Sequence, residues 1–198
     1  MNRALDVLVA GLALAVSSPL LAICALAIKL TSPGPVIYRQ RRVGLDGEPF
    51  DLLKLRTMVV GAEHTGAGLY IEDRDPRITR VGRVLRRFSL DELPNLFNVL
   101  RGELAIVGPR PTVQSQVDRY TPHQRRRLEA RPGITGWAQV NGRTSLSWPE
   151  RIELDVWYVD NRSLALDLRI LARTARLLVT GHGLYSADLT QGWDEDAR

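Results

Sequence analysis

Two adjacent carboxylates, Asp91 and Glu92, are the residues best placed to do chemistry, because arginines lie on both sides of them in the sequence. They stand at the expected start of a helix, where unpaired amides and the helix dipole favour an ionised carboxylate. Neighbours on a helix point about 100° apart, so the two acids can take different roles. Near Arg86 and Arg110, an ionised aspartate is a potential nucleophile, so one acid could attack or bind a metal while the other orients the reacting groups. The alternative is an ordinary helix cap.

A second pair of acids, Asp73 and Asp75, lies in a polar loop. Such a pair could hold the metal of a nucleotide-sugar glycosyltransferase, but two acids in this setting are more often part of a turn. The three histidines lack metal-ligand spacing, and a single cysteine, Cys24, excludes a cysteine zinc site. The sequence contains none of the common glycine-rich nucleotide motifs and no serine-hydrolase motif.

The composition favours one globular domain with anionic partners. The chain has 198 residues, of which 44% are apolar and 25% charged, which excludes long disorder and a many-spanning membrane protein. Of the 27 basic residues only Lys29 and Lys54 are lysines. Guanidinium groups suit phosphates and lipid headgroups.

One long apolar segment near the N-terminus is a candidate for a lipid environment. Residues 7–28 carry no charge, and as a helix they would extend roughly 33 Å, enough to cross a bilayer core. A cleaved signal peptide is the competing interpretation. We favour a retained membrane segment, because the run is long, contains scattered Ala and Gly, and shows no clear cleavage site.

The middle of this segment contains Ser17, Ser18 and Pro19. Proline removes one backbone donor and must kink or break the helix there, and the serine hydroxyls can bond to the freed carbonyls. Basic residues flank both ends, so both ends favour the cytoplasmic side. A re-entrant hairpin satisfies this pattern. From the residues alone, a kinked spanning helix remains an equal alternative.

The remaining chain predicts an α+β fold, mostly helical with a small β-hairpin. Residues 36–43 and 50–58 favour two strands around a Gly-rich turn. A helix from Arg80 carries an apolar stripe. A second helix follows, and Ser89 and Glu92 form its expected capping box. Its expected buried face consists of Leu93, Leu96, Phe97 and Leu100. A brief strand over residues 103–107 and basic or amphipathic helices over 124–131 and 163–180 follow; amphipathic helices of this kind suit a membrane surface.

Several motifs together resemble the monotopic phosphoglycosyl transferases, also called bacterial sugar transferases. The resemblance runs along nearly the whole chain and is carried by the following segments: Ser18-Pro19, Lys54-Leu55-Arg56-Thr57-Met58, residues 86–99 around Asp91-Glu92, Gly108-Pro109-Arg110-Pro111, and residues 131–143. It implies a minimal single-domain form with a re-entrant hairpin over 1–30, a cytosolic catalytic domain over 31–182 lying on the membrane, and a polar tail over 183–198.

The resemblance also implies a reaction and its participants. The family transfers a sugar 1-phosphate from a UDP-sugar to a polyprenyl (undecaprenyl) phosphate, through a covalent aspartyl phosphosugar and with Mg²⁺, which starts exopolysaccharide or O-antigen assembly. By match, Asp91 is the nucleophile and metal contact, Glu92 its catalytic partner, and Arg86, Arg110 and Lys54 bind substrate phosphate, Lys54 also pairing with the acids. A further contact by Asp167 is a weaker implication. The expected location is the cytoplasmic face of the bacterial inner membrane.

Two alternative functions stay open at this point. One is a membrane-anchored, metal-dependent glycosyltransferase that uses Asp73 and Asp75, and the other is a non-enzymatic, arginine-rich membrane adaptor. The leaving group distinguishes them: UMP for the phosphoglycosyl transferase, UDP for the glycosyltransferase, and none for the adaptor. Nucleic acid is disfavoured as a partner, because the basic residues follow amphipathic helices. The sugar and the choice between monomer and homodimer are not determined by the sequence.

Overall fold

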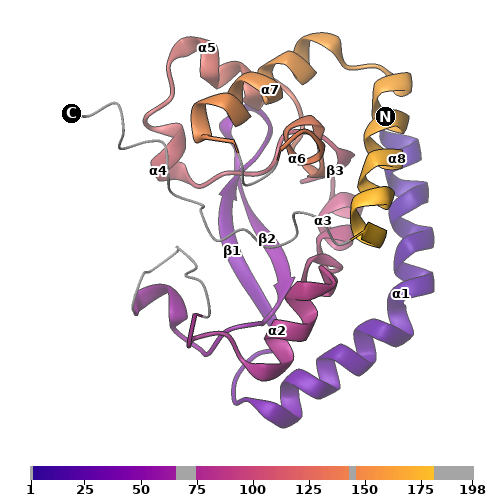
Figure 1. Ribbon diagram of the computed structural model, residues 1–198, viewed down its shortest axis with the longest axis vertical. Coiled ribbons are helices and arrows are strands. Elements are labelled where there is room, and N and C mark those ends of the chain that lie inside the picture. The colour runs from indigo at the N-terminus through magenta and orange to yellow at the C-terminus, as the bar shows by residue number, and fades with distance from the viewer. Residues whose placement is uncertain (1, 66–74, 143–145, 181–198) are drawn as a thin grey trace.

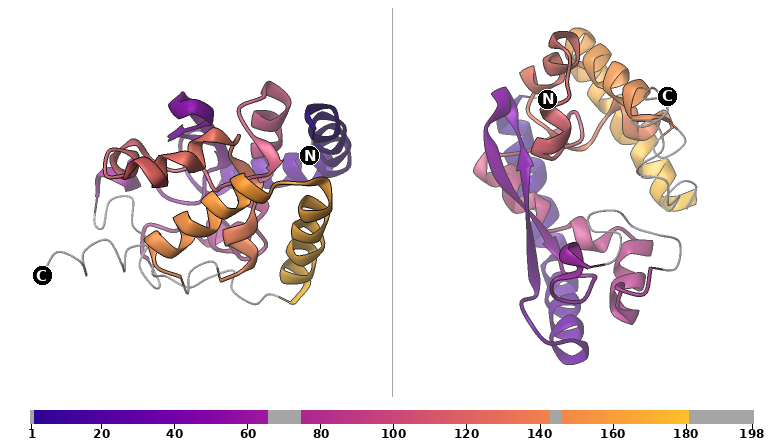
Figure 2. Two further views of the ribbon diagram at one scale, coloured as in Figure 1. Left: turned by 90° about the horizontal axis from the view of Figure 1, so that it is seen from above. Right: turned by 90° about the vertical axis from the view of Figure 1, so that its left-hand side faces the viewer.

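The computed structural model describes residues 2–65, 75–142 and 146–180, and it confirms an α+β fold in which helices predominate (Figure 1). The helices are α1 (Arg3–Thr31), α2 (Arg80–Arg87), α3 (Asn95–Arg101), α4 (Gln114–Val117), α5 (Pro122–Arg125), α6 (Trp137–Val140), α7 (Trp148–Asn161) and α8 (Leu164–Thr180). The strands are β1 (Ile37–Val43), β2 (Pro49–Leu55), β3 (Ala105–Val107) and β4 (Gly133–Thr135). Strands β1 and β2 with α1 lie on one side of the molecule, and α7 and α8 on the other (Figure 2).

The predicted hairpin is present as the antiparallel pair β1–β2, with Tyr38 opposite Lys54 and Arg42 opposite Phe50. Side chains of successive residues point to opposite faces of a strand. Arg39 and Arg41 are exposed, whereas Tyr38, Gln40 and Arg42 are partly buried. The hairpin therefore presents one row of polar side chains toward the rest of the protein.

A second sheet, the parallel pair β3–β4, was not predicted. Glycines make its close packing feasible. A Cβ atom on Gly133 would lie 2.1 Å from the backbone nitrogen of Gly108, and one on Gly136 would lie 2.1 Å from the Gly108 carbonyl oxygen. Residues 133–140 thus form a strand and a short helix, and Gly133 and Gly136 allow their close packing against Gly108.

The N-terminal segment forms one continuous helix, α1, that changes direction along its length (Figure 1). Pro19 lies inside it, so the carbonyl of Ala15 has no backbone partner four residues on. The Ser18 hydroxyl donates to that carbonyl at 2.9 Å, and the Ser17 hydroxyl donates to the Ala13 carbonyl at 2.6 Å. The predicted kink and its serine compensation are confirmed, in the form of a bend and not of two separate helices.

Helix α1 is long and apolar enough to cross a membrane, yet only 11% of its most apolar window is buried in the protein. Ala10 and Leu14 belong to the main core. Other apolar side chains of α1 face outward, and Val16 is 83% exposed. A core helix of a soluble protein would bury such residues.

Both ends of α1 are bonded to the globular part. Near the start, Arg3 donates to the carbonyls of Val99 and Leu100 at the end of α3, and the buried Asp6 accepts from the Ile106 amide at 3.0 Å. At the other end, the buried Arg56 donates to the Ser32 carbonyl at 2.9 Å and to the Pro33 carbonyl. The two ends of the helix are therefore held by the same folded unit.

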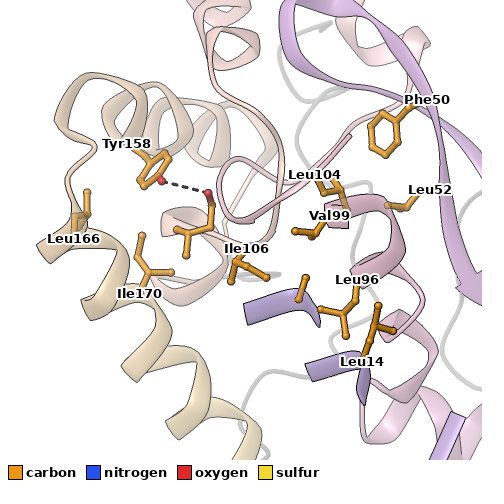
Figure 3. Close-up of a cluster of buried hydrophobic side chains, with 12 residues drawn as sticks. Leu14, Phe50, Leu52, Leu96, Val99, Leu104, Ile106, Tyr158, Leu166 and Ile170 are labelled. Atoms are coloured by element: carbon orange, nitrogen blue, oxygen red, sulfur yellow. Dashed lines mark hydrogen bonds between the residues drawn. The ribbon is translucent and has the colours of Figure 1, made fainter. Parts of the chain in front are cut away.

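The main hydrophobic core joins α1, β2, α3, β3, α7 and α8 (Figure 3). Helix α8 confirms the predicted element; Leu166 and Ile170 pack inward, whereas Leu164 and Leu168 are exposed. The predicted buried face of α3 is wrong for Phe97 and Leu100, which are exposed. Regular helix starts at Asn95, directly after Pro94, and Leu96 and Val99 form its buried face.

Candidate active site

The acidic pair lies on a single 3₁₀ turn, Leu90–Glu92, between α2 and α3. Ser89 precedes it in the left-handed conformation, with φ of 54°, and its side chain makes no capping hydrogen bond. The predicted capping box between Ser89 and Glu92 is therefore wrong. The physical reason is that the Glu92 carboxylate turns toward two cations from other elements instead of back to the Ser89 amide.

Glu92 is held by Lys54 of β2 and by Arg110 of the turn after β3. Lys54 Nζ lies 3.0 Å and Arg110 Nη2 2.9 Å from the same oxygen, Oε1 of Glu92. Burial disfavours ionisation of Glu92, but the two cations outweigh it and hold the pKa of Glu92 well below its usual range. The prediction that Lys54 pairs with the acids agrees with this geometry.

Asp91 has a different environment. It is only 9% exposed, and among the described residues no side chain forms a hydrogen bond or ion pair with its carboxylate. Burial and the neighbouring charge of Glu92 raise the pKa of Asp91, and Lys54 and Arg86 partly oppose that rise. A backbone amide at this turn favours the ionised form, as expected, but burial outweighs it and the net shift in the pKa of Asp91 is upward.

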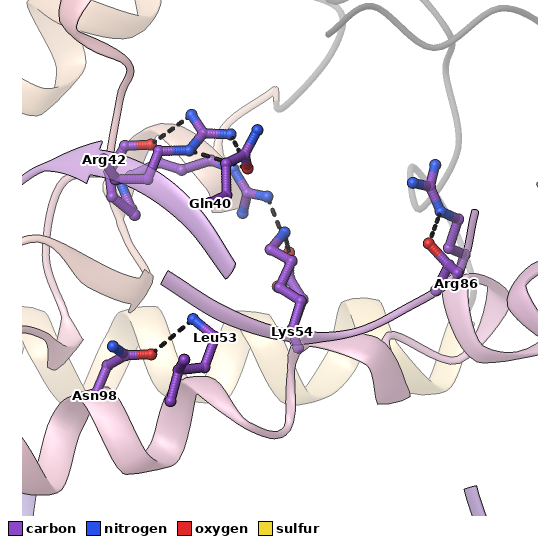
Figure 4. A network of polar contacts seen from close by, with 10 residues as sticks. Gln40, Arg42, Leu53, Lys54, Arg86 and Asn98 are labelled. Carbon is purple, nitrogen blue, oxygen red and sulfur yellow. Dashed lines mark hydrogen bonds and ion pairs between the residues drawn. The ribbon is translucent and has the colours of Figure 1, made fainter. Parts of the chain in front are cut away.

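Arg86 on α2 completes the predicted set. Its Nε donates to the Thr57 hydroxyl at 2.8 Å, and Figure 4 shows Arg86, Lys54 and Arg42 extending to the same side of the hairpin. On the other side of the hairpin, Asn98 of α3 accepts from the Leu53 amide at 3.0 Å. The fold thus brings together all five residues that the sequence predicted for catalysis and phosphate binding: Lys54, Arg86, Asp91, Glu92 and Arg110.

The sequence did not single out Arg42, which lines a pocket together with Lys54, Glu92 and Arg110. A signal was available, because Tyr38, Gln40 and Arg42 alternate along one strand and must share a face with Lys54 across the pair.

A buried charge cluster behind Arg110 was also missed. Arg127 donates to the Arg110 carbonyl at 3.0 Å, and its guanidinium is bonded to Asp155 and to the Tyr120 hydroxyl. Arg127 and Asp155 are 2% and 1% exposed. Arg127 follows two other arginines in the chain, so nothing local distinguishes it as the buried one.

The weaker candidates lie elsewhere in the hydrogen-bond network. Asp75 is 1% exposed and accepts from the Arg77 guanidinium through both oxygens, at 2.6–3.2 Å, while Asp73 lies outside the described residues. Asp167 is buried and accepts from the Tyr158 hydroxyl at 2.7 Å. These contacts give Asp75 and Asp167 structural partners.

In the described ranges, no group of three or more His, Cys, Asp or Glu side chains could hold a metal ion. Mg²⁺ usually takes one or two carboxylates, with substrate phosphates and waters as the other ligands. Asp91, whose oxygens accept no side-chain hydrogen bond, fits such a site, whereas Glu92 already accepts from two cations.

Comparison with known proteins assigns the chain to a family. The family model described as "Bacterial sugar transferase" matches residues 1–181. The chain belongs to the bacterial sugar transferase family. This assignment confirms the resemblance inferred from the motifs around Pro19, Asp91 and Arg110.

Three relatives illustrate what this sugar transferase is similar to. It is 44% identical to the "Uncharacterized sugar transferase EpsL" of Bacillus subtilis, over 93% of this chain and 90% of EpsL. It is 47% identical to the "UDP-glucose:undecaprenyl-phosphate glucose-1-phosphate transferase" of Caulobacter vibrioides, over 93% of this chain and 72% of that protein. The "UDP-N-acetylgalactosamine-undecaprenyl-phosphate N-acetylgalactosaminephosphotransferase" of Aeromonas hydrophila is 43% identical over 92% of this chain, which spans only 44% of that protein.

Proposed function

We propose that this enzyme transfers a sugar 1-phosphate from a UDP-sugar to a polyprenyl phosphate, with a covalent phosphosugar on Asp91. The names of two relatives, from Caulobacter vibrioides and Aeromonas hydrophila, describe this type of reaction for those proteins. We assign the roles of the two acids from one observation, which is that their contacts with cations differ. Both cations that touch the pair bind Glu92, and neither touches Asp91.

This asymmetry favours Asp91 as the nucleophile. A carboxylate whose pKa is strongly lowered and whose oxygen accepts two charged hydrogen bonds is a poor nucleophile, which describes Glu92. The raised pKa of Asp91 makes its ionised form more basic. Glu92 instead fixes Lys54 and Arg110 in place, where they can meet the phosphate oxygens of a substrate.

The reaction then has two steps that balance. A carboxylate oxygen of Asp91 attacks the sugar-bearing phosphorus, and the bond to the other phosphate breaks, so that UMP leaves. An oxygen of the polyprenyl phosphate next attacks the same phosphorus and returns Asp91 as a carboxylate. An anion attacks an anion in both steps, so the cationic side chains Lys54, Arg86 and Arg110 are needed to offset the repulsion.

Asp91 would also contact Mg²⁺, together with substrate phosphates. When bound, the ion would neutralise part of the phosphate charge. We expect EDTA to abolish turnover and added Mg²⁺ to restore it.

We further propose that α1 enters and leaves the membrane on the cytoplasmic face. Both of its ends bond to one folded domain, through Arg3 and Asp6 at one end and through Arg56 at the other. A spanning helix would need its two ends on opposite sides of the bilayer, which this arrangement opposes. The exposed apolar surface between the ends then faces lipid, and the catalytic pair lies near the headgroups.

The reaction is tested with the purified full-length chain, a panel of UDP-sugars and polyprenyl phosphate. We expect UMP release, a mass increase of one sugar phosphate on the peptide that carries Asp91, and loss of both in Asp91→Asn. Asp51→Asn is the matched control, because Asp51 lies on β2, the strand that carries Lys54, and its carboxylate pairs with Arg41 at the surface. Full UMP release by Asp91→Asn would contradict the proposal, and UDP release would indicate a glycosyltransferase.

The topology is tested by labelling single cysteines in a Cys24→Ala background with a maleimide that cannot cross membranes. Asn2→Cys reports the start of α1, and Arg41→Cys reports the hairpin, where Arg41 is exposed. A re-entrant helix protects both positions in intact spheroplasts and exposes both after lysis. Labelling of Asn2→Cys alone in intact spheroplasts would indicate a spanning helix.

A further inference from the structure

Arg42 is a charged side chain beside the proposed site whose hydrogen-bond partners are all neutral. Its Nε and Nη2 donate to the Gln40 amide oxygen at 3.1 and 2.7 Å, and its Nη1 donates to the Pro111 carbonyl at 3.3 Å (Figure 4). Within the described ranges no carboxylate forms an ion pair with it. Two nearby arginines differ, because Arg110 has Glu92 and Arg127 has Asp155.

A partly buried guanidinium without a counter-ion carries a desolvation cost that an anion would relieve. The electrostatic environment of Arg42 agrees with this. Burial and the charge of Arg110 lower the pKa of Arg42 to about 10, although Tyr38 and Glu92 oppose the shift. Arg42 stays protonated at neutral pH, so its charge remains to be balanced.

The remaining donors of Arg42 suit an oxyanion. An arginine has five N–H donors, and three of those on Arg42 point to Gln40 and Pro111. The two that remain are one on each terminal nitrogen, and charged N–H groups of this kind bind phosphate oxygens. Gln40 and Pro111 also hold the guanidinium plane, so little side-chain freedom would be lost on binding.

The pocket that Arg42 lines contains an excess of positive charge. Its charged walls are Arg42, Lys54, Arg110 and Glu92. Three cations face one carboxylate, which leaves two positive charges without compensation in the pocket. A ligand with one or two phosphate groups would balance them.

We propose that the terminal nitrogens of Arg42 bind phosphate oxygens of the substrate, with Gln40 as the residue that positions them. The proposal rests on the proposed function only in calling the ligand a substrate. The phosphate could belong to the nucleoside diphosphate sugar or to the prenyl phosphate, which share this chemistry.

The first test measures the affinity of the purified full-length chain for inorganic pyrophosphate by calorimetry. We expect Arg42→Gln to weaken binding about tenfold, because a charge-assisted contact is lost. Arg41→Gln is the matched control and should bind like wild type, since Arg41 lies on the opposite face of the strand. Arg42→Lys keeps the charge but loses the paired terminal nitrogens, so it should also bind several-fold more weakly.

Wild-type affinity in Arg42→Lys would overturn the proposal even if Arg42→Gln does not fold. Wild-type affinity in a folded Arg42→Gln would overturn it as well. This assay needs no turnover, so it decides the matter even if the chain transfers no sugar phosphate and the proposed function fails.

The second test separates the two sources of phosphate by steady-state kinetics of Arg42→Gln. About a tenfold rise in KM for the UDP-sugar assigns Arg42 to the nucleotide, and a similar rise in KM for a short-chain prenyl phosphate assigns it to the lipid substrate. A fall in kcat with both KM values unchanged would overturn a binding role.

Discussion

Two charge clusters meet at Arg110 and differ in their balance. In the buried cluster, Arg127 and Asp155 are a one-to-one pair, both almost fully excluded from solvent. In the candidate site, Lys54 and Arg110 share one oxygen of Glu92, while Asp91 has no cation in contact among the described residues. In the first cluster the charges already compensate each other. In the second, a carboxylate and several cations remain available to contact a ligand.

The contacts of the acidic residues distinguish the two clusters more clearly than their burial does. Asp91 is almost as buried as Asp155, yet only Asp155 contacts an arginine directly. The backbone differs too. Asp155 lies within the regular helix α7, while Asp91 lies in a 3₁₀ turn after the left-handed Ser89.

The largest effect is expected from breaking the balanced pair. Arg127→Met leaves the Asp155 carboxylate buried without a counter-ion, which costs roughly 3–5 kcal/mol of unfolding free energy. In a domain of this size the melting temperature should fall by about 10 °C, as measured by thermal denaturation in detergent. The control is Arg126→Met, whose surface pair with Asp160 should matter little. A variant as stable as wild type would contradict a structural role for Arg127.

Breaking the unbalanced cluster should affect activity more than stability. Glu92→Gln removes the anion that holds Lys54 and Arg110, so we expect kcat to fall roughly 100-fold while the fold persists. Glu153→Gln, which loses only an exposed contact to His123, is the control. UMP release and circular dichroism, measured on the same samples, check both parts. If Glu92→Gln lowered the melting temperature as much as Arg127→Met does, Glu92 would also have a structural role, which would contradict the prediction.

The pH dependence sharpens the contrast between the two acids. Asp91 must be ionised to attack, and its pKa is raised above 3.8, the ordinary value for Asp. UMP release from the UDP-sugar alone should therefore fall as the pH decreases, with a midpoint above pH 3.8. Glu92 raises the pKa of Asp91, so Glu92→Gln should move this acid limb to lower pH. Single-turnover rates across pH provide the measurement. A limb that stays in place or moves upward would show that another group titrates.

The smallest effect concerns the backbone before the acidic pair. Ser89 adopts a positive φ and its side chain caps nothing, so Ser89→Gly should relieve strain at no contact cost. The net gain is roughly 0.5 kcal/mol of unfolding free energy, because glycine also loses more entropy on folding. Denaturant titration measures it. A loss of stability would mean that Ser89 makes a contribution beyond its conformation.

Local patterns predicted the elements that depend on local physics. The apolar run around Pro19 predicted the bent helix α1, alternation and a Gly-rich turn predicted β1–β2, and the arginine-flanked stripe after Thr79 predicted α2. Pairings between distant segments were missed. A brief strand was predicted over residues 103–107, where β3 lies, but its three-residue partner β4 is too short to carry a recognisable period and lies far from it in the chain.

The site was predictable to the extent that its residues belong to motifs. Asp91, Glu92, Arg86, Arg110 and Lys54 came together as predicted, although Lys54 is 38 residues from Glu92 and no periodicity links them. The choice of the attacking acid depends on which carboxylate the cations touch, and only tertiary geometry determines that. The capping box failed for the same reason, because distant cations compete for the Glu92 side chain.

The attachment of α1 at Arg3 and Asp6 also bears on how this enzyme can be handled and redesigned. Deleting the helix would strip Ala10 and Leu14 from the core and leave the Ile106 amide without its acceptor. A water-soluble truncation of the catalytic domain is therefore unattainable by simple removal of its apolar segment. Exchanging that segment for an unrelated helix would meet the same obstacle, since Asp6, Ala10 and Leu14 of α1 are part of the protein interior.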